Sequence, residues 1–242
     1  SDPRLSPDGT TVAYVVTRLD KDADTYKAAI WLVPVTGGAP RQLTSGAFRD
    51  TNPRWSPDGT RIAFVSNREG LAPLDKDGKP VEKKEGKPPS QVWTIAIDGG
   101  EATQLTRQES GASSPEWSPD GGTIAFLSGT EPAGEPGVPD SPHKKIADER
   151  IITRITYRFD GRGFIDRYQH IFTIPATGGE AKQLTYGDMD DGGFAWAPDG
   201  RSIAFLSNRL PDRELNRVTL VYSVPAAGGE ARCLTPGAYD LD

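Results

Sequence analysis

Short apolar stretches alternate with turn-forming residues along the whole chain. Between residues 52 and 66, the stretches "NPRW" and "RIAFVS" flank the sequence "SPDG". Short alternating runs of β-branched and aromatic residues are typical of strands. Pro-Asp-Gly favours a tight turn, because proline presets φ, aspartate bonds its own local backbone and glycine takes the left-handed conformation. A Gly-Gly pair between "QVWTIAI" and "ATQLT" marks a second tight turn. The pattern predicts four antiparallel strands joined by a PDG hairpin, a longer connection and a GG hairpin.

The same unit occurs four times. Its first signature is "LSPDGTTVAY", "WSPDGTRIAF", "WSPDGGTIAF" and "WAPDGRSIAF", and its second is "GGAPRQLT", "GGEATQLT", "GGEAKQLT" and "GGEARCLT". The spacings between successive PDG turns are 50, 62 and 79 residues, whereas those between the Gly-Gly pairs are 62, 79 and 50. Unequal periods with matching ends indicate a constant unit that carries variable insertions. We place the units at about 3–44, 52–106, 114–185 and 193–235.

A sheet of four short strands has two apolar faces and cannot bury both of them alone. Repeating such a sheet radially covers the faces and leaves only short edges, which is the architecture of a β-propeller. We therefore expect an all-β chain that forms a single domain over residues 1–242 and consists of four four-stranded antiparallel blades.

Composition and charge limit the function classes. The 242 residues carry a formal net charge of −6 and contain one cysteine, Cys233. An acidic balance predicts no electrostatic surface for nucleic acid or for an anionic membrane, and one cysteine excludes an internal disulfide. The chain has no apolar run of the roughly 18 residues that a spanning helix needs, and its N-terminal sequence shows no signal peptide. We expect a cytoplasmic protein with no membrane or nucleic-acid partner.

The repeat resembles a known propeller family. "WSPDGxxIAFxS" followed by "GGExxQLT" is similar to the repeat shared by TolB-type proteins and the prolyl oligopeptidase family of serine peptidases. The opening "SDPRLSPDGTTVAYVVT" and the stretch "IADERIITRITYRFDGRGFIDRYQHIFTIPATGGEAKQLT" resemble the N-terminal propeller of bacterial acylaminoacyl-peptidase-like members. This resemblance implies a ring of about seven blades that restricts peptide access to a C-terminal α/β-hydrolase domain and contacts that domain. The four blades would then be an open part of a larger ring.

The catalytic part of such a peptidase is missing from these residues. The family's nucleophilic serine lies in a G-x-S-x-G turn, and "GASSP" at 111–115 lacks the final glycine. No alternation of strands and helices indicates a parallel sheet. We expect a non-catalytic, cofactor-free portion whose partners are the hydrolase domain and a peptide substrate. An open arc would also self-associate through the apolar faces of its end blades, whereas a closed four-bladed ring, the alternative, would not.

Two long insertions, at about 69–90 and 129–167, separate the second and third strands of their blades. The first is rich in Lys, Pro and Gly and indicates a solvated loop. The second contains "KIADERIITRITYRF", whose alternation predicts an added strand or hairpin with "DGRG" at 160–163 as its turn. Because the guanidinium fork matches carboxylates, this segment supplies the candidate contacts to the hydrolase domain or to a peptide: Arg154, Arg158, Asp160 and Arg162. The alternative is a set of solvated charges in weak surface ion pairs.

Other polar clusters have structural explanations. "DKDGK" at 75–79 and "DMDDGG" at 188–193 resemble calcium-binding carboxylate clusters, but neither completes the twelve-residue loop with its final glutamate. We therefore expect both to be turns. His143 and His170 lack partners at metal-binding spacing, so solvation or packing is the expected role of each, and no metal site is predicted.

Residues of the repeat signature itself are expected to serve the fold. A tryptophan precedes the PDG turn in three units, and its repeated position predicts packing between blades: Trp55, Trp117 and Trp196. The aspartates of the four PDG turns are predicted to form those turns: Asp8, Asp58, Asp120 and Asp199.

Two other function classes use the same repeats. A stand-alone TolB-like propeller would act as a protein-binding platform, and would need a signal peptide and a periplasmic partner. A sugar-active or lactonase-type propeller enzyme would need carboxylates or metal ligands around a central channel, and the expected innermost strands offer only Glu116. The coding sequence downstream would distinguish the TolB-like platform from the peptidase, because only the peptidase requires a G-x-S-x-G motif there.

Overall fold

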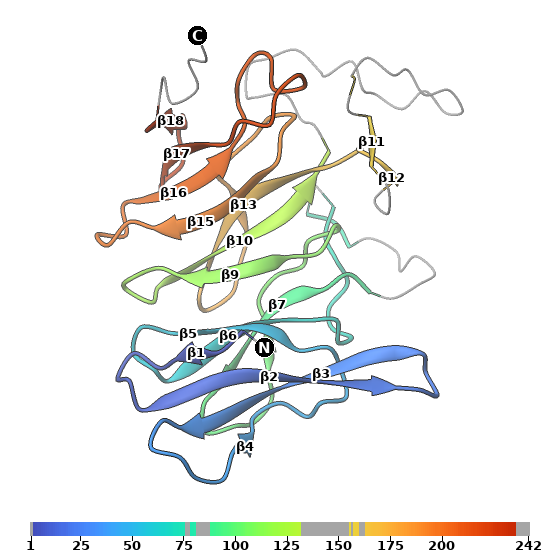
Figure 1. Ribbon diagram of the computed structural model, residues 1–242, viewed down its shortest axis with the longest axis vertical. Helices are drawn as coiled ribbons and strands as arrows, with labels where there is room; N and C mark the ends of the chain where they lie inside the picture. Colours follow the sequence, from blue (N-terminus) through green and yellow to red (C-terminus); the bar gives the residue numbers. More distant parts are fainter. Residues whose placement is uncertain are drawn as a thin grey trace. The chain divides into compact units, whose positions relative to one another are not determined.

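The computed structural model describes residues 2–75, 78–80, 88–131, 155, 157–159 and 163–235. In this part of the chain, antiparallel strands form four four-stranded sheets and one two-stranded sheet (Figure 1). The predicted all-β fold with four four-stranded antiparallel sheets is therefore confirmed. Among the described residues, no helix is long and apolar enough to cross a membrane.

The first and second sheets follow chain order, β1-β2-β3-β4 and β5-β6-β7-β8. Their strands are β1 Arg4–Leu5, β2 Thr11–Asp20, β3 Thr25–Pro34, β4 Arg41–Gln42, β5 Thr51–Trp55, β6 Arg61–Ser66, β7 Gln91–Ala96 and β8 Thr103–Gln104. The longest pairing joins β2 to β3, from Thr11 opposite Pro34 to Asp20 opposite Thr25.

The third sheet has the order β14-β13-β10-β9 and the fourth β15-β16-β17-β18, while β11 and β12 form the two-stranded sheet. Their strands are β9 Ser113–Trp117, β10 Thr123–Thr130, β11 Arg158–Phe159, β12 Gly163–Phe164, β13 Tyr168–Pro175, β14 Lys182–Gln183, β15 Asp191–Trp196, β16 Ser202–Ser207, β17 Leu220–Pro225 and β18 Arg232–Cys233.

The chain divides into two compact units, which are described separately. Unit one comprises Ser1–Leu127 with Thr173–Lys182, and unit two comprises Ser128–Phe172 with Gln183–Asp242. The assignment of residues 1–242 to a single propeller domain stays a prediction.

In each PDG hairpin, the aspartate side chain accepts a hydrogen bond from the backbone amide two residues further on. In the second sheet, Ser56 Oγ donates to Asp58 Oδ1 over 2.6 Å, and the same oxygen accepts from the Thr60 amide over 3.1 Å. Gly59 has a φ of +70°, which glycine adopts without the strain a side chain would add. The predicted turn-forming role of the aspartate is confirmed here and in the other hairpins, at Asp8, Asp120 and Asp199.

The threonine that ends each second signature ties the third strand of its sheet to the fourth. In the second sheet, Thr106 Oγ1 accepts a hydrogen bond from the Val92 amide over 2.8 Å. The equivalent bonds in the other sheets join Thr44 to Ile30, Thr185 to Ile171 and Thr235 to Val221. The threonine that ends each second signature is thus explained by strand pairing.

The core of unit one forms where opposite faces of consecutive sheets meet. We call the side of a sheet that carries Ile62, Phe64, Trp93 and Ile95, or their equivalents, its aromatic face. The other side, which carries the equivalents of Ala13, Val15, Ile30 and Leu32, is its aliphatic face. Ala13, Ile30 and Leu32 of the first sheet form one buried cluster with all four aromatic-face residues of the second sheet. In unit one, the aliphatic face of one sheet therefore packs on the aromatic face of the next.

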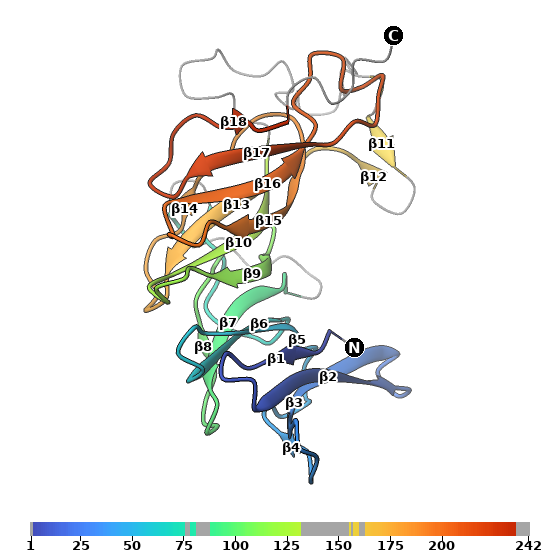
Figure 2. The same ribbon diagram turned by 60° about the vertical axis from the view of Figure 1, so that its left-hand side comes forward.

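The tryptophan before a PDG turn links the first strands of successive sheets in unit one. Trp55 Nε1 donates to the Arg4 carbonyl over 2.9 Å, and Trp117 Nε1 donates to the Arg54 carbonyl over 3.0 Å. Arg4 and Arg54 occupy equivalent positions on β1 and β5, which lie side by side (Figure 2). The predicted packing role is confirmed for these two tryptophans.

Candidate functional site

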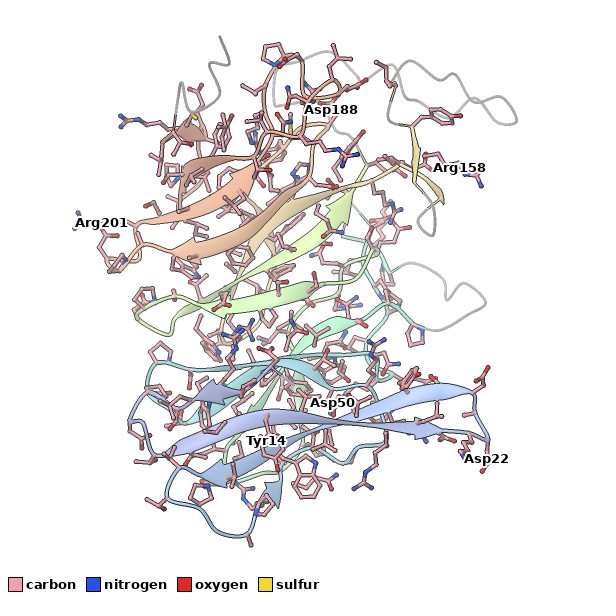
Figure 3. The ribbon with its side chains drawn as sticks, viewed as in Figure 1. Tyr14, Asp22, Asp50, Arg158, Asp188 and Arg201 are labelled. Carbon is pink, nitrogen blue, oxygen red and sulfur yellow. The ribbon has the colours of Figure 1, made fainter. Side chains whose placement is uncertain are left out.

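The second insertion forms the predicted hairpin at the residues that the structure describes. β11 pairs with β12, with Arg158 opposite Phe164 and Phe159 opposite Gly163. Arg158 is exposed and lies on the far side of unit two from Arg201 of the last PDG turn (Figure 3). The other three candidate contacts, Arg154, Asp160 and Arg162, lie outside the described residues, as does His143. Their roles stay predictions.

A second charged group lies on the first strands of unit one. Arg54 on β5 donates through Nε to Glu116 Oε1 on β9 over 2.7 Å, and through a terminal nitrogen to Asp2 Oδ2 over 3.1 Å. Asp2 also pairs with Arg4 over 2.8 Å. We call these four residues the first-strand cluster. The repeat explains why they meet, because Arg4, Arg54 and Glu116 stand at equivalent places on neighbouring strands.

The electrostatics of this cluster are governed by Arg54. Its side chain is 14% exposed, whereas those of Asp2 and Glu116 are 32% and 38% exposed. Burial by itself lowers the pKa of Arg54, but the carboxylates of Glu116 and Asp2 outweigh burial and raise it. The guanidinium therefore stays charged, and the cluster presents two carboxylates to solvent around a fixed cation.

Unit two contains a buried charged cluster that the sequence analysis missed. His170 on β13 and Asp191 at the start of β15 are 1% and 2% exposed, and His170 Nδ1 lies 3.0 Å from Asp191 Oδ2. Arg209 donates to both carboxylate oxygens of Asp191, over 2.8 and 2.9 Å. Its guanidinium also lies over the Phe205 and Tyr222 rings, 5.3 and 5.7 Å from their centroids.

Both ring nitrogens of His170 have partners inside unit two. His170 Nε2 lies 3.0 Å from the Gly187 carbonyl oxygen, and Nδ1 faces the Asp191 carboxylate. The ring therefore connects β13 to the segment that leads into β15, which agrees with the packing role expected for this histidine.

The Asp–Arg half of the cluster recurs in the second sheet. Arg68 donates to Asp50 over 2.8 Å and lies over the Phe64 and Trp93 rings. Figure 3 labels Asp50, which precedes β5. Asp50 and Asp191 precede their tryptophans by the same interval, and both arginines end a repeated "SNR". At the corresponding places the third repeat has Ala112 and Thr130, so both members of the pair are replaced together. This paired replacement is the sequence signal that could have revealed the ion pair.

The histidine is not repeated. The residue equivalent to His170 in the first repeat is Ala29, which offers Asp50 no donor. Accordingly, Asp50 Oδ1 is buried without a hydrogen-bond partner among the described residues. The two ion pairs occupy equivalent positions in the repeat. Both carboxylate oxygens of Asp191 have hydrogen-bond partners, whereas only one oxygen of Asp50 does.

The two acidic segments require one correction. In 75–79 the Asp75 side chain accepts from the Lys79 amide, which supports the predicted turn. In 188–193 the turn explanation is wrong for Asp191, because this residue lies in β15 and holds the buried ion pair. Asp188 pairs with Arg213, and Asp190 accepts from the Gln169 amide. Within the described residues, no group of three or more His, Cys, Asp or Glu side chains could hold a metal ion.

Comparisons with known proteins identify the type of propeller. No protein-family model matches the chain. An uncharacterized peptidase of Bacillus subtilis, YuxL, is 32% identical over 212 residues, which cover 86% of this chain and 29% of YuxL. An acylaminoacyl peptidase solved with Z-Gly-Gly-Phe-chloromethyl ketone aligns over 97% of this chain and 32% of its own, with a TM-score of 0.67 and 19% identity. A TolB-type structure from Agrobacterium tumefaciens aligns over 97% of this chain and 64% of its own, with a TM-score of 0.55 and 21% identity.

These relatives confirm the resemblance that the repeats indicated. The chain is a β-propeller segment with homologues among peptidases and TolB-like proteins. It spans less than a third of the length of YuxL and of the acylaminoacyl peptidase.

Proposed function

We propose that these 242 residues are the propeller portion of a serine peptidase of the acylaminoacyl- or dipeptidyl-peptidase kind. In this proposal, the propeller restricts peptide access to a C-terminal α/β-hydrolase domain and contacts that domain. The match to YuxL carries the proposal, because 86% of this chain corresponds to only 29% of a longer peptidase. The bond-breaking serine would belong to the remainder of the protein.

The first-strand cluster is the part of unit one best suited to meet a peptide. Blades surround a central channel in a propeller, and the first strands β1, β5 and β9 carry Arg4, Arg54 and Glu116 at equivalent positions. The cluster offers both signs of charge at one place, with the carboxylates more accessible than Arg54. Such a surface would contact the termini and polar side chains of a short peptide through charge-assisted hydrogen bonds.

The hairpin of β11 and β12 is the proposed contact with the hydrolase domain. Arg158 is exposed on this hairpin, and the Ile155 amide donates to Glu214 Oε2 over 2.9 Å. This bond links the insertion to the connection between β16 and β17, 59 residues further along the chain. The second insertion and the β16–β17 connection are thus joined within unit two.

Peptide hydrolysis by the complete gene product tests the proposal. We expect the complete protein to cleave an N-acylated aminoacyl substrate and residues 1–242 alone to show no hydrolysis above buffer. Peptide hydrolysis by residues 1–242 alone would contradict the proposal that the catalytic serine belongs to the remainder of the protein. A complete protein without peptidase activity would favour the TolB-like binding platform.

Replacing Arg158 in the complete protein tests the proposed contact. If the hairpin positions the hydrolase domain or a peptide carboxylate, Arg158→Ala should lower kcat/KM about tenfold, the factor that corresponds to about 1.4 kcal/mol. Arg201→Ala is the matched control, since Arg201 is also exposed but lies in a PDG turn on the other side of unit two. Equal kcat/KM values for wild type and Arg158→Ala would contradict the proposed contact.

A further inference from the structure

In the part of the chain that the structure describes, the longest hairpin is that of β2 and β3. These strands are ten residues long, whereas the equivalent strands β6 and β7 of the second sheet are six. Because Tyr14 and Phe64 occupy equivalent positions, the first sheet continues over 17–20 and 25–28 after the strands of the second sheet have ended. Four further residues lengthen a strand by about 13 Å, and Figure 3 labels Asp22 at the end of this projection. We call these residues and the turn between them the hairpin extension.

One face of the hairpin extension displays two large apolar side chains. Leu19 lies opposite Tyr26, and the two residues are 53% and 59% exposed. Side chains alternate between the faces of a strand, so Lys27 and Asp20 lie on the other face, where they form an ion pair over 2.6 Å. The hairpin extension therefore has one charged side and one apolar side.

The neighbouring sheet is present on the apolar side. Leu19 and Tyr26 continue the aliphatic face of the first sheet, which the second sheet covers at Ala13 and Ile30, both 0% exposed. The two side chains are exposed because the first sheet projects past the strands that cover it, not because a neighbouring sheet lies outside these residues. Only a group outside the four sheets can bury them.

The apolar pair is too small to hold a separate protein by itself. An aromatic side chain buries about 150–250 Å², so Tyr26 together with Leu19 offers roughly 300–400 Å². Two copies joined through this pair would bury less than the roughly 1,200 Å² of a stable complex. A domain of the same polypeptide needs no such area, because the connecting chain keeps it at a high effective concentration. The pair therefore fits a tethered domain.

We propose that the hairpin extension is a docking element for the C-terminal hydrolase domain, with Leu19 and Tyr26 as its apolar contact. This inference rests on the proposed function, which supplies the domain. The match to YuxL supports it, because the matched residues amount to only 29% of that peptidase and most of its chain lies elsewhere.

The place of the hairpin extension in the repeat supports the same partner. The extension joins the second strand of its sheet to the third, and the insertion with β11 and β12 lies at the equivalent place, between β10 and β13. Equivalent ends of the blades lie on one face of a propeller. A hydrolase domain that contacts the β11–β12 hairpin would therefore contact the hairpin extension as well.

Photo-cross-linking in the complete gene product tests this contact. Tyr26 is replaced with the photoreactive amino acid p-benzoylphenylalanine, which keeps an aromatic ring, and the cross-linked peptides are identified by mass spectrometry after irradiation. We expect cross-links from position 26 to residues beyond 242, in the segment that carries the nucleophilic serine. The same replacement of Asp98 is the control and should give no such cross-link, because Asp98 is also exposed but lies in the turn after β7, at the opposite end of the second sheet.

Alanine variants of the complete protein test whether the contact matters for turnover. Leu19→Ala and Tyr26→Ala should each lower kcat/KM for an N-acylated aminoacyl substrate about tenfold, a factor typical of an interface anchor. Asp98→Ala should keep the wild-type value, and circular dichroism checks that all three variants are folded. Wild-type kcat/KM in both hairpin variants would contradict the docking role.

Other cross-linking results would overturn the proposal. Cross-links from position 26 only to residues within 1–242 would mean that another part of the propeller covers the pair, and cross-links between two copies would indicate self-association. Peptide hydrolysis without any cross-link beyond residue 242 would exclude this contact and leave the proposed function standing. Cross-links beyond residue 242 in a protein that hydrolyses no peptide would exclude a hydrolase domain as the partner, and the proposed function with it.

Discussion

Asp191 illustrates how one buried carboxylate is kept ionised. Burial by itself raises the pKa of Asp191, but the hydrogen bond to His170 and the charge of Arg209 outweigh it and hold the pKa below its ordinary value of 3.8. A buried ion pair is costly when one partner is lost, because the remaining charge stays desolvated. The pair therefore matters for the integrity of unit two, whatever the complete protein catalyses.

Replacing Asp191 with asparagine should destabilise unit two strongly at neutral pH. We expect Asp191→Asn to lower the free energy of unfolding by about 3–5 kcal/mol, the usual cost of breaking a buried pair, measured by urea unfolding at pH 7. Lys27→Ala is the control, since the Lys27–Asp20 pair is partly exposed and should leave the unfolding midpoint unchanged.

The same variant has a predictable dependence on pH. Because the folded pKa of Asp191 lies below 3.8, its contribution to stability is complete above that pH and is lost as the pH falls through the folded value. The difference in stability between wild type and Asp191→Asn should therefore narrow below pH 3.8. A gap that stays constant through this acid range would contradict the charge assignment.

At the scale of the element, the PDG hairpin determines where each sheet begins. The Ser56 hydroxyl, followed by the Thr60 amide and hydroxyl, lowers the pKa of Asp58, and the equivalent groups lower that of Asp8. For Asp120 the serine hydroxyl and the amide of Gly122 lower the pKa. Gly59 supplies the left-handed residue, and a Cβ there would meet only the Pro7 side chain, at 3.7 Å. The demand for glycine at this position therefore comes from the backbone, not from crowding.

Gly59→Ala isolates that backbone requirement. We expect it to lower the free energy of unfolding by about 1–2 kcal/mol, the cost of a left-handed conformation for a residue with a Cβ. Gly192→Ala is the matched control, because Gly192 lies in extended β15, has no positive φ and has no atom within 4 Å of its added Cβ. Denaturant unfolding in which the two variants lose equal stability would show that the turn tolerates a side chain.

The elements that sequence reasoning located are those with repeated turn chemistry. PDG and Gly-Gly fix the hairpins, so four sheets could be assigned from spacing alone. The extension of β2 and β3 through 17–27 could not, because this stretch is polar and its strands continue on backbone pairing and exposed side chains. Likewise, the first-strand cluster depends on which strands are neighbours in space, and only the repeat equivalence of Arg54 and Glu116 hints at it.

For the whole molecule, we propose that the propeller and the catalytic serine belong to different parts of the complete protein. Packing between sheets and the hydrogen bonds of the turns and strand ends account for the repeated signatures. Several charged groups of the described residues are engaged in ion pairs or turns, among them Arg54, Asp191 and Asp58. The relatives place such a segment within a much longer peptidase.

The most direct measurement is covalent labelling with a fluorophosphonate probe, which reacts with an activated serine nucleophile. The complete gene product and residues 1–242 would be treated in parallel, and the modified residue would be identified by mass spectrometry. The account predicts one labelled serine in the complete protein, outside residues 1–242, and no labelling of residues 1–242 alone. Labelling of a serine within residues 1–242, or no labelling of the complete protein, would contradict it.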